Sequence, residues 1–265
     1  MKILAIDTSS KNASVAITEN EEKLIELNNA DEKTHSQKLM TMIDEAFQKT
    51  EMSLDNIDLI VCCLGPGSFT GVRIGIATAK AFADSKNIRV TGVNSLEELA
   101  YNLNTEGYVC SLIDAGHGNT YAGFFKMEKD KAGKLQTVQE ELTFLNLKDE
   151  NGEISEDKLM AFLEKNLEKN ENTEIPKVDE TESKKRVIYF IGDATVTYEK
   201  LFQNLKIVTS IYEIKLANHN QNIASGITLA QVGYTKYKNG KYGDSSVLSP
   251  VYLRKSQAEI ALAEK

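Results

Sequence analysis

Residues 57–85 constrain the fold of this chain more than any other part of the sequence. The stretch begins with a nearly unbroken apolar run at 57–64, which predicts a strand buried on both faces, as in a parallel sheet. Gly65-Pro66-Gly67 then ends the strand with a tight turn. Ser68 is a favourable N-cap, and residues 69–85 favour a helix. Backbone N–H groups at such a helix start can bind an anion, a phosphate included.

The predicted helix 69–85 carries small residues along one side. Four of them, Gly71, Gly75, Ala79 and Ala83, recur every four residues and form one smooth ridge. Two interpretations remain open: the helix is buried on all sides within one domain, or it presents this ridge to a second protein. We adopt the second. The interface residues assigned to this helix are Phe69, Gly71, Val72, Gly75, Ile76, Ala79 and Ala83.

A second helix is predicted at 35–49, because its apolar residues keep helical spacing. A place in the core is the default interpretation of such a stripe, but its methionines also suit an adaptable interface. Packed beside the helix at 69–85, it would form a four-helix bundle with two helices of a partner or of a second copy. On this hypothesis Ala79→Arg abolishes association and leaves the chain folded. The interface residues assigned here are His35, Leu39, Met42, Ile43 and Ala46.

Composition narrows the class of protein. The chain has 265 residues, with 41% apolar and 26% charged residues, which is enough for one large domain or two ordinary ones. A net charge of −8 argues against a chain that binds nucleic acid by itself. Cys62, Cys63 and Cys110 are odd in number and suggest no disulfide framework, so we expect a reduced, cytoplasmic protein. We expect neither a signal peptide nor a membrane span.

One order of elements occurs twice along the chain. A strand at 1–6 ends in Asp7 and leads into a hairpin, and a strand at 108–113 ends in Asp114 and does the same. Each half later has a strand closed by a glycine turn and followed by a helix. A repeat at half the chain length indicates an α/β fold of two homologous lobes, each a mixed sheet flanked by helices. This is the duplicated plan of the actin-like (ASKHA) superfamily.

The lobes are predicted at 1–104 and 105–265. Within the second, residues 128–185 turn polar and are interpreted as an insertion, with a helix at 156–168 and a surface loop that extends through Pro176. A further helix is predicted at 221–237.

The glycine turn and the helix that follows it resemble the signature of the TsaB (YeaZ) family. The resemblance rests on residues 65–75, Gly-Pro-Gly-Ser-Phe-Thr-Gly-Val-Arg-Ile-Gly, on Ala79-Lys80, and on a tail at 250–254 that reads Pro-Val-Tyr-Leu-Arg. It implies a non-catalytic partner subunit in the synthesis of threonylcarbamoyl-adenosine in bacterial tRNA. The implied partners are TsaD, TsaE and a second copy of the chain, with tRNA reached only through the complex.

Two hairpin loops are the places where this chain could bind a nucleotide. An acid at the end of a strand is usually only a turn former, but the first hairpin resembles the first phosphate loop of the actin-like superfamily. In the second lobe Gly116 replaces the family's usual Arg, and Asn119 replaces an acid. We therefore expect no cofactor, with at most weak ATP or ADP binding. The residues assigned to this weak site are Asp7, Thr8, Gly65 and Gly67.

The sequence offers no catalytic residues. TsaD carries a metal-binding His-x-x-x-His, and the matching positions here are Ser95 and Leu99. The three histidines share no ligand spacing, so we expect no metal and no activity of the chain alone. Two alternatives stay open: an actin-like ATPase or kinase, which needs intact phosphate loops in both lobes, and a glycoprotease-like peptidase, which needs the histidine pair.

Overall fold

The computed structural model describes residues 1–30, 35–171, 186–204 and 212–254. The loop predicted around Pro176 lies outside them. The chain forms two compact units, one from Met1–Asn102 together with Ile223–Lys265, and one from Leu103–Asn222. Among the described residues no helix is long and apolar enough to cross a membrane.

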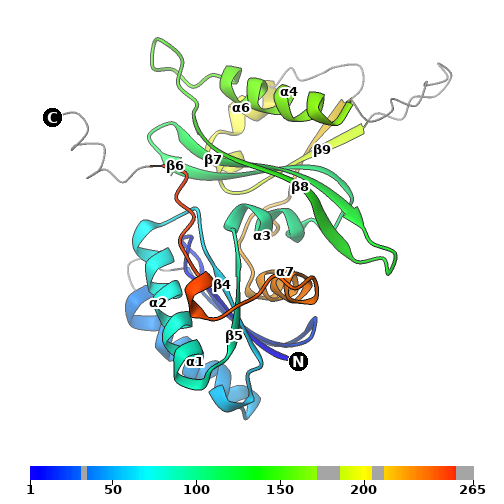
Figure 1. Cartoon of the computed structure of the whole chain (residues 1–265). Coiled ribbons are helices and arrows are strands. Elements are labelled where there is room, and N and C mark those ends of the chain that lie inside the picture. The colour runs from blue at the N-terminus through cyan, green and yellow to red at the C-terminus, as the bar shows by residue number, and fades with distance from the viewer. Residues whose placement is uncertain (31–34, 172–185, 205–211, 255–265) are drawn as a thin grey trace. The chain divides into compact units, whose positions relative to one another are not determined.

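The first unit is built on a mixed five-stranded sheet with the order β3-β2-β1-β4-β5 (Figure 1). Its first three strands pair antiparallel, whereas β4 runs parallel to β1 and β5 runs parallel to β4. The predicted mixed sheet is therefore confirmed. The strands are β1 (Lys2–Asp7), β2 (Ala13–Glu19), β3 (Glu22–Asn29), β4 (Leu59–Cys63) and β5 (Arg89–Val93).

Both faces of this sheet are covered, as the apolar run at 57–64 predicts. Successive side chains of a strand point to opposite faces. In β1, Leu4 and Ile6 pack with α1 (His35–Thr50) and α2 (Phe69–Lys86), and Ile3 and Ala5 pack with α7 (Gly226–Lys238) on the other face (Figure 1). The unit also contains α3 (Ser95–Asn102) and the short 3-10 helices η2 (Leu54–Asn56) and η3 (Ser245–Val247).

The second unit repeats this plan. Its sheet has the order β10-β9-β6-β7-β8, in which β6–β8 form the antiparallel part, and β9 and β10 run parallel to β6. Read from the antiparallel edge, the order matches that of the first sheet, so the predicted duplication is confirmed. The strands are β6 (Gly107–Gly116), β7 (Asn119–Lys129), β8 (Leu135–Asn146), β9 (Arg186–Ile191) and β10 (Tyr212–Leu216).

Helices α4 (Asp157–Glu171) and α6 (Glu199–Asn204) lie on the same side of this second sheet, and α5 (Ala194–Thr197) is a single short turn (Figure 1). Leu159 and Leu163 of α4 and Phe202 of α6 pack in one core with Phe124 of the sheet. Much of the predicted polar insertion is thus part of the lobe, because β8 pairs along the whole of β7 and α4 covers the sheet.

The predicted second lobe at 105–265 needs a correction at its C-terminal end. The first boundary falls after Asn102, close to the prediction, but the chain returns to the first unit at Ile223. The reason is apolar burial: Leu229, Ala230 and Val232 of α7 pack on the first sheet. This helix begins at Gly226 rather than at residue 221, because Ser225 caps it by accepting a hydrogen bond from the Thr228 N–H.

Candidate functional site

The glycine turn lies against the loop between β1 and β2. The Ser68 N–H donates to the carbonyl oxygen of Ser9 over 2.7 Å, and the Ser68 side chain caps α2 by accepting from the Gly71 N–H over 3.2 Å. A Cβ atom on Gly67 would lie 2.1 Å from the Ser9 carbonyl oxygen, and one on Gly71 would lie 2.0 Å from that of Thr8. Glycine is required here because two backbones pass too close for a side chain.

The structure brings together the residues predicted to form a weak nucleotide site. β1 ends at Asp7 and Thr8 follows it, while Gly67 of the Gly65–Gly67 turn lies against the next residue, Ser9. The Asp7 carboxylate accepts from the Ser9 N–H over 2.7 Å, and the Thr8 hydroxyl donates to the Gly71 carbonyl over 2.7 Å. Both side chains are buried. Their hydrogen-bonding groups therefore stabilise the loop itself.

A buried acidic cluster lies beneath this loop. The ligand atoms of Asp7, Cys63 and Glu98 all lie within 4.8 Å of one another. Glu98 accepts from the Ser225 N–H over 3.0 Å, and the Cys63 thiol donates to the Ser9 hydroxyl over 3.4 Å. Sequence reasoning missed this cluster because its members come from a strand end, a strand and a helix that only the fold brings together.

Burial decides the protonation of this cluster. Desolvation, reinforced by the Asp7 charge, raises the pKa of the Glu98 carboxyl well above its ordinary value. The same two causes raise the pKa of the Cys63 thiol. The raised pKa favours the protonated form of Glu98 beside the Asp7 charge, and Cys63 stays a thiol that is a poor nucleophile.

The second unit has a corresponding site, formed by the two turns that the sequence pointed to. The Asp114 carboxylate accepts from the Gly116 N–H over 2.8 Å and from the Tyr198 hydroxyl over 3.1 Å. The Asp193 carboxylate accepts from the Asp114 N–H over 2.8 Å. Desolvation, together with Asp114, raises the pKa of Tyr198 to about 12. These contacts hold the hairpin turn to the glycine turn after β9.

Most residues assigned to a partner interface lie in the core of the first unit, and that assignment is corrected. Gly71 and Gly75 pack against Thr8, so the small-residue ridge allows α2 to approach β1 and not a partner. Phe69 is the exception, with 40% of its surface exposed, and the side chain of His35 lies outside the described part of the chain. Buried in the unit's own core are Leu39, Met42, Ile43, Ala46, Val72, Ile76, Ala79 and Ala83.

The outward face of α2 is a different ridge. Phe69, Arg73, Ala77 and Ala81 recur every four residues and are all exposed. The Arg73 guanidinium carbon lies 3.8 Å from the centre of the Phe69 ring, and its Nε donates to the Tyr252 hydroxyl over 2.8 Å. Tyr252 stacks on Phe69 with 4.9 Å between ring centres. The four-residue spacing was visible in the sequence, but it does not reveal which of two parallel ridges faces the sheet.

Comparison with known proteins places this chain in a family. The family model described as "TsaD: tRNA N6-adenosine threonylcarbamoyltransferase" matches residues 29–262, nearly the whole chain. A Bacillus subtilis protein named tRNA threonylcarbamoyladenosine biosynthesis protein TsaB is 29% identical over 98% of this chain and 96% of its own length. The chain belongs to the TsaB (YeaZ) family.

Two further similarities accompany that match. A Haemophilus influenzae protein with the same TsaB name is 34% identical over 49% of this chain and 56% of its own length. The solved structure of YeaZ from Pseudomonas aeruginosa superimposes with a TM-score of 0.67 at 20% identity, covering 95% of this chain and 99% of that one. This TsaB-family chain therefore shares the fold of that YeaZ structure, with the two mixed sheets described above.

Ser95 and Leu99 stand where the resemblance to TsaD would place two histidines, and in this TsaB-family chain both have structural roles. Ser95 donates its hydroxyl to the Pro66 carbonyl and its N–H to the Gly65 carbonyl, so it ties α3 to the glycine turn. Leu99 is buried. The neighbouring Glu97 forms a 2.6 Å ion pair with Lys236 of α7.

Proposed function

We propose that this chain is a partner subunit of an assembly that makes threonylcarbamoyl-adenosine in tRNA, and that it binds and activates TsaD, with TsaE as a third component. Membership of the TsaB family supports the process, since the Bacillus subtilis relative is named for that biosynthesis. The observation that carries the proposal for this chain is the outward ridge of α2, defined by Phe69, Arg73, Ala77 and Ala81.

The outward ridge has the chemistry of a protein-binding surface. Aromatic residues and arginine supply most of the energy at such surfaces, and Phe69, Arg73 and Tyr252 already form one ordered stack. Ala77 and Ala81 leave room for a second helix to approach closely. Met40 of α1 is 51% exposed and adds an adaptable apolar group from the neighbouring helix.

The outward ridge can also pack against the same ridge of a second copy, so this surface would form a homodimer when TsaD is absent. With a net charge of −8, we propose that the chain reaches tRNA only through the complex. The engaged groups of Asp7 and Thr8 support at most weak nucleotide binding at the Gly65–Gly67 turn. The role of this subunit is to hold TsaD in its active form.

The test is the variant Ala77→Arg. A long charged side chain on the ridge should separate the two helices and weaken TsaD binding by roughly 100-fold, while the fold stays intact because residue 77 is exposed. Ala132→Arg, on the exposed turn between β7 and β8, is the matched control and should bind as the parent does.

Calorimetry with purified TsaD measures the affinity, sedimentation measures self-association, and a thermal melt verifies folding. Unchanged TsaD binding by a folded Ala77→Arg variant would show that the surface lies elsewhere. Failure of the parent chain itself to bind TsaD would overturn the proposed function.

A further inference from the structure

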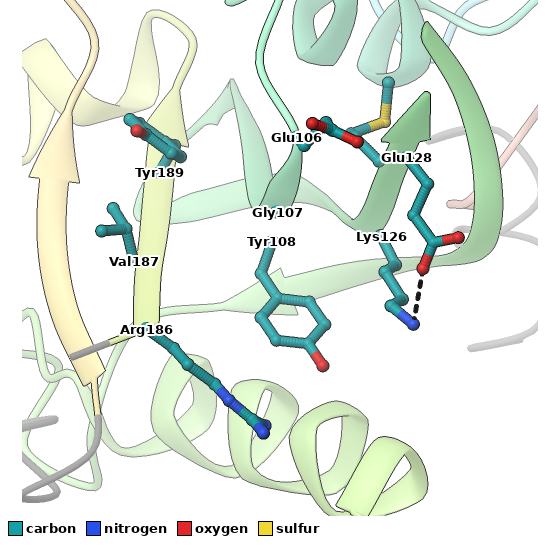
Figure 2. A pocket seen from close by; sticks show the side chains of 9 residues that line it. Glu106, Gly107, Tyr108, Lys126, Glu128, Arg186, Val187 and Tyr189 are labelled. Carbon is teal, nitrogen blue, oxygen red and sulfur yellow. Dashed lines mark ion pairs between the residues drawn. The ribbon is translucent and has the colours of Figure 1, made fainter. Parts of the chain in front are cut away.

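A hollow lies at one edge of the second sheet, where β6 and β9 begin and β7 ends (Figure 2). Because β6 and β9 are parallel and β7 is antiparallel to β6, these three strand ends meet at the same edge. The hollow has a volume of about 520 Å³, which suits a small organic molecule. It is separate from the glycine turn, the buried acidic cluster and the outward ridge of α2.

Three hydrogen-bond donors share one face of the sheet at this hollow. Tyr108 of β6 pairs with Lys126 of β7 on one side and with Ile188 of β9 on the other, so all three side chains lie on the same face. Arg186 is two residues before Ile188 and shares that face. Figure 2 shows the hydroxyl of Tyr108, the ammonium of Lys126 and the guanidinium of Arg186 on the same side of the strands.

Tyr108 is held in place before any ligand arrives. Its ring lies between Phe124, at 5.5 Å between centres, and Tyr212, at 6.3 Å. Only 9% of its surface is exposed. The buried ring fixes the direction of its hydroxyl group, so little freedom is lost when that group donates a hydrogen bond.

Two cations, Lys126 and Arg186, and two carboxylates, Glu106 and Glu128, line the hollow. Lys126 forms a 2.8 Å ion pair with Glu128, which raises the pKa of its ammonium group, while the nearby Arg186 charge acts in the opposite direction. Arg186 makes no ion pair with any described residue. The carboxylate of Glu106, also at the hollow, accepts from the Lys129 N–H over 3.0 Å. Since Lys126 is paired with Glu128, Arg186 is the cation at the hollow for which the described residues supply no ion-pair partner.

We propose that this hollow binds a small metabolite through an oxyanion, either a phosphate ester or a carboxylate. Arg186 presents a planar fork of donors that matches two oxygens of such a group. Tyr108 donates its hydroxyl, and Lys126 keeps two of its three ammonium protons free after pairing with Glu128. The volume leaves room for the body of the molecule beside the strands.

The experiment titrates the full chain with inorganic phosphate and, separately, with citrate, and follows the backbone amide resonances of β6, β7 and β9. We expect saturable shifts around Gly107 and Val187, with the stronger probe identifying the oxyanion class. Arg186→Gln should weaken binding by roughly 10-fold, and Tyr108→Phe by a few-fold, since each removes donors to the same group.

Lys200→Gln is the matched control, because Lys200 is an exposed cation on α6 and its loss changes the net charge equally. Melts of all variants verify folding, and Tyr108→Phe keeps the buried ring. Absence of saturable shifts with both probes would overturn the proposal. So would an Arg186→Gln variant that binds as the parent does, or a Lys200→Gln variant that loses as much affinity, since the latter would indicate only general attraction.

Discussion

At the residue scale, the buried carboxyl group of Glu98 links pH to the stability of the first unit. Four titratable groups face each other there: Glu98, Asp7, Cys63 and, more weakly, Glu26. The raised pKa of Glu98 means that the folded chain retains a proton that the unfolded chain releases above its ordinary value of 4.5. The folded state then binds more protons, so stability falls as pH rises from about 4.5 through the raised pKa.

Glu98→Gln removes this titration while it keeps an acceptor for the Ser225 N–H. We expect the variant to unfold at a higher urea concentration than the parent at pH 8, with a difference that shrinks toward pH 5. Urea unfolding at several pH values measures this. Glu97→Gln is the neighbouring control and should destabilise the chain, because it breaks the buried ion pair with Lys236. A less stable Glu98→Gln at pH 8 would mean that the charged form, or a bound cation, stabilises the cluster.

At the element scale, the two ridges of helix α2 have different surroundings. The inner ridge of Gly71, Gly75, Ala79 and Ala83 is buried in the first unit's own structure, and the outer ridge from Phe69 to Ala81 is exposed. Both ridges have the spacing and the small residues that a close helix contact needs. Only the position of the sheet decides between them.

Ala79→Arg should therefore unfold the first unit, so the prediction that it leaves the chain folded is wrong. Ala79 is fully buried, so the variant combines overpacking with an unpaired buried charge, at a cost of about 3–5 kcal/mol. Ala77→Arg, two residues away on the exposed side, is the control and should melt within a few degrees of the parent. Thermal melts of both variants measure their unfolding temperatures. A cooperative Ala79→Arg transition at a temperature near that of the parent would contradict the core assignment.

At the scale of the whole molecule, the chain leaves the first unit, forms the second, and returns to complete the first. The segment from Ile223 supplies α7, whose Leu229 and Ala230 cover the face of the first sheet that α1 and α2 do not reach. The first unit is thus made from two segments that are distant in sequence, although each unit repeats the same strand order.

A chain that ends at Asn222 should lose the fold of the first unit, because Ile3, Ala5 and Val61 would face water. A chain that ends at Arg254 is the control and keeps every described element. Limited proteolysis followed by mass spectrometry measures the result. Rapid cleavage within β1–β5 is expected for the shorter chain alone, and protection of that region in both chains would show that α7 is dispensable.

Local signals in the sequence determined much of this protein. The apolar run at 57–64, the glycine turn and Ser68 gave the central strand, its turn and the capped helix, because periodicity, turn geometry and capping depend on neighbouring residues. The repeated acid at the end of a strand revealed the duplication. Polar β8 and short β10 were missed, since the half-exposed strand β8 has no continuous apolar pattern.

Only the tertiary structure decided which surfaces face each other. In the folded chain Ala79 is buried and Ala77 is exposed, and α7 packs on the first sheet. Asp7, Cys63 and Glu98 lie close together. The tertiary structure also placed Tyr108, Lys126 and Arg186 on one face through strand pairing. The physical reason is common to all: a sequence pattern describes how apolar and polar groups alternate along a segment, whereas burial and charge depend on contacts between residues that are distant in the chain.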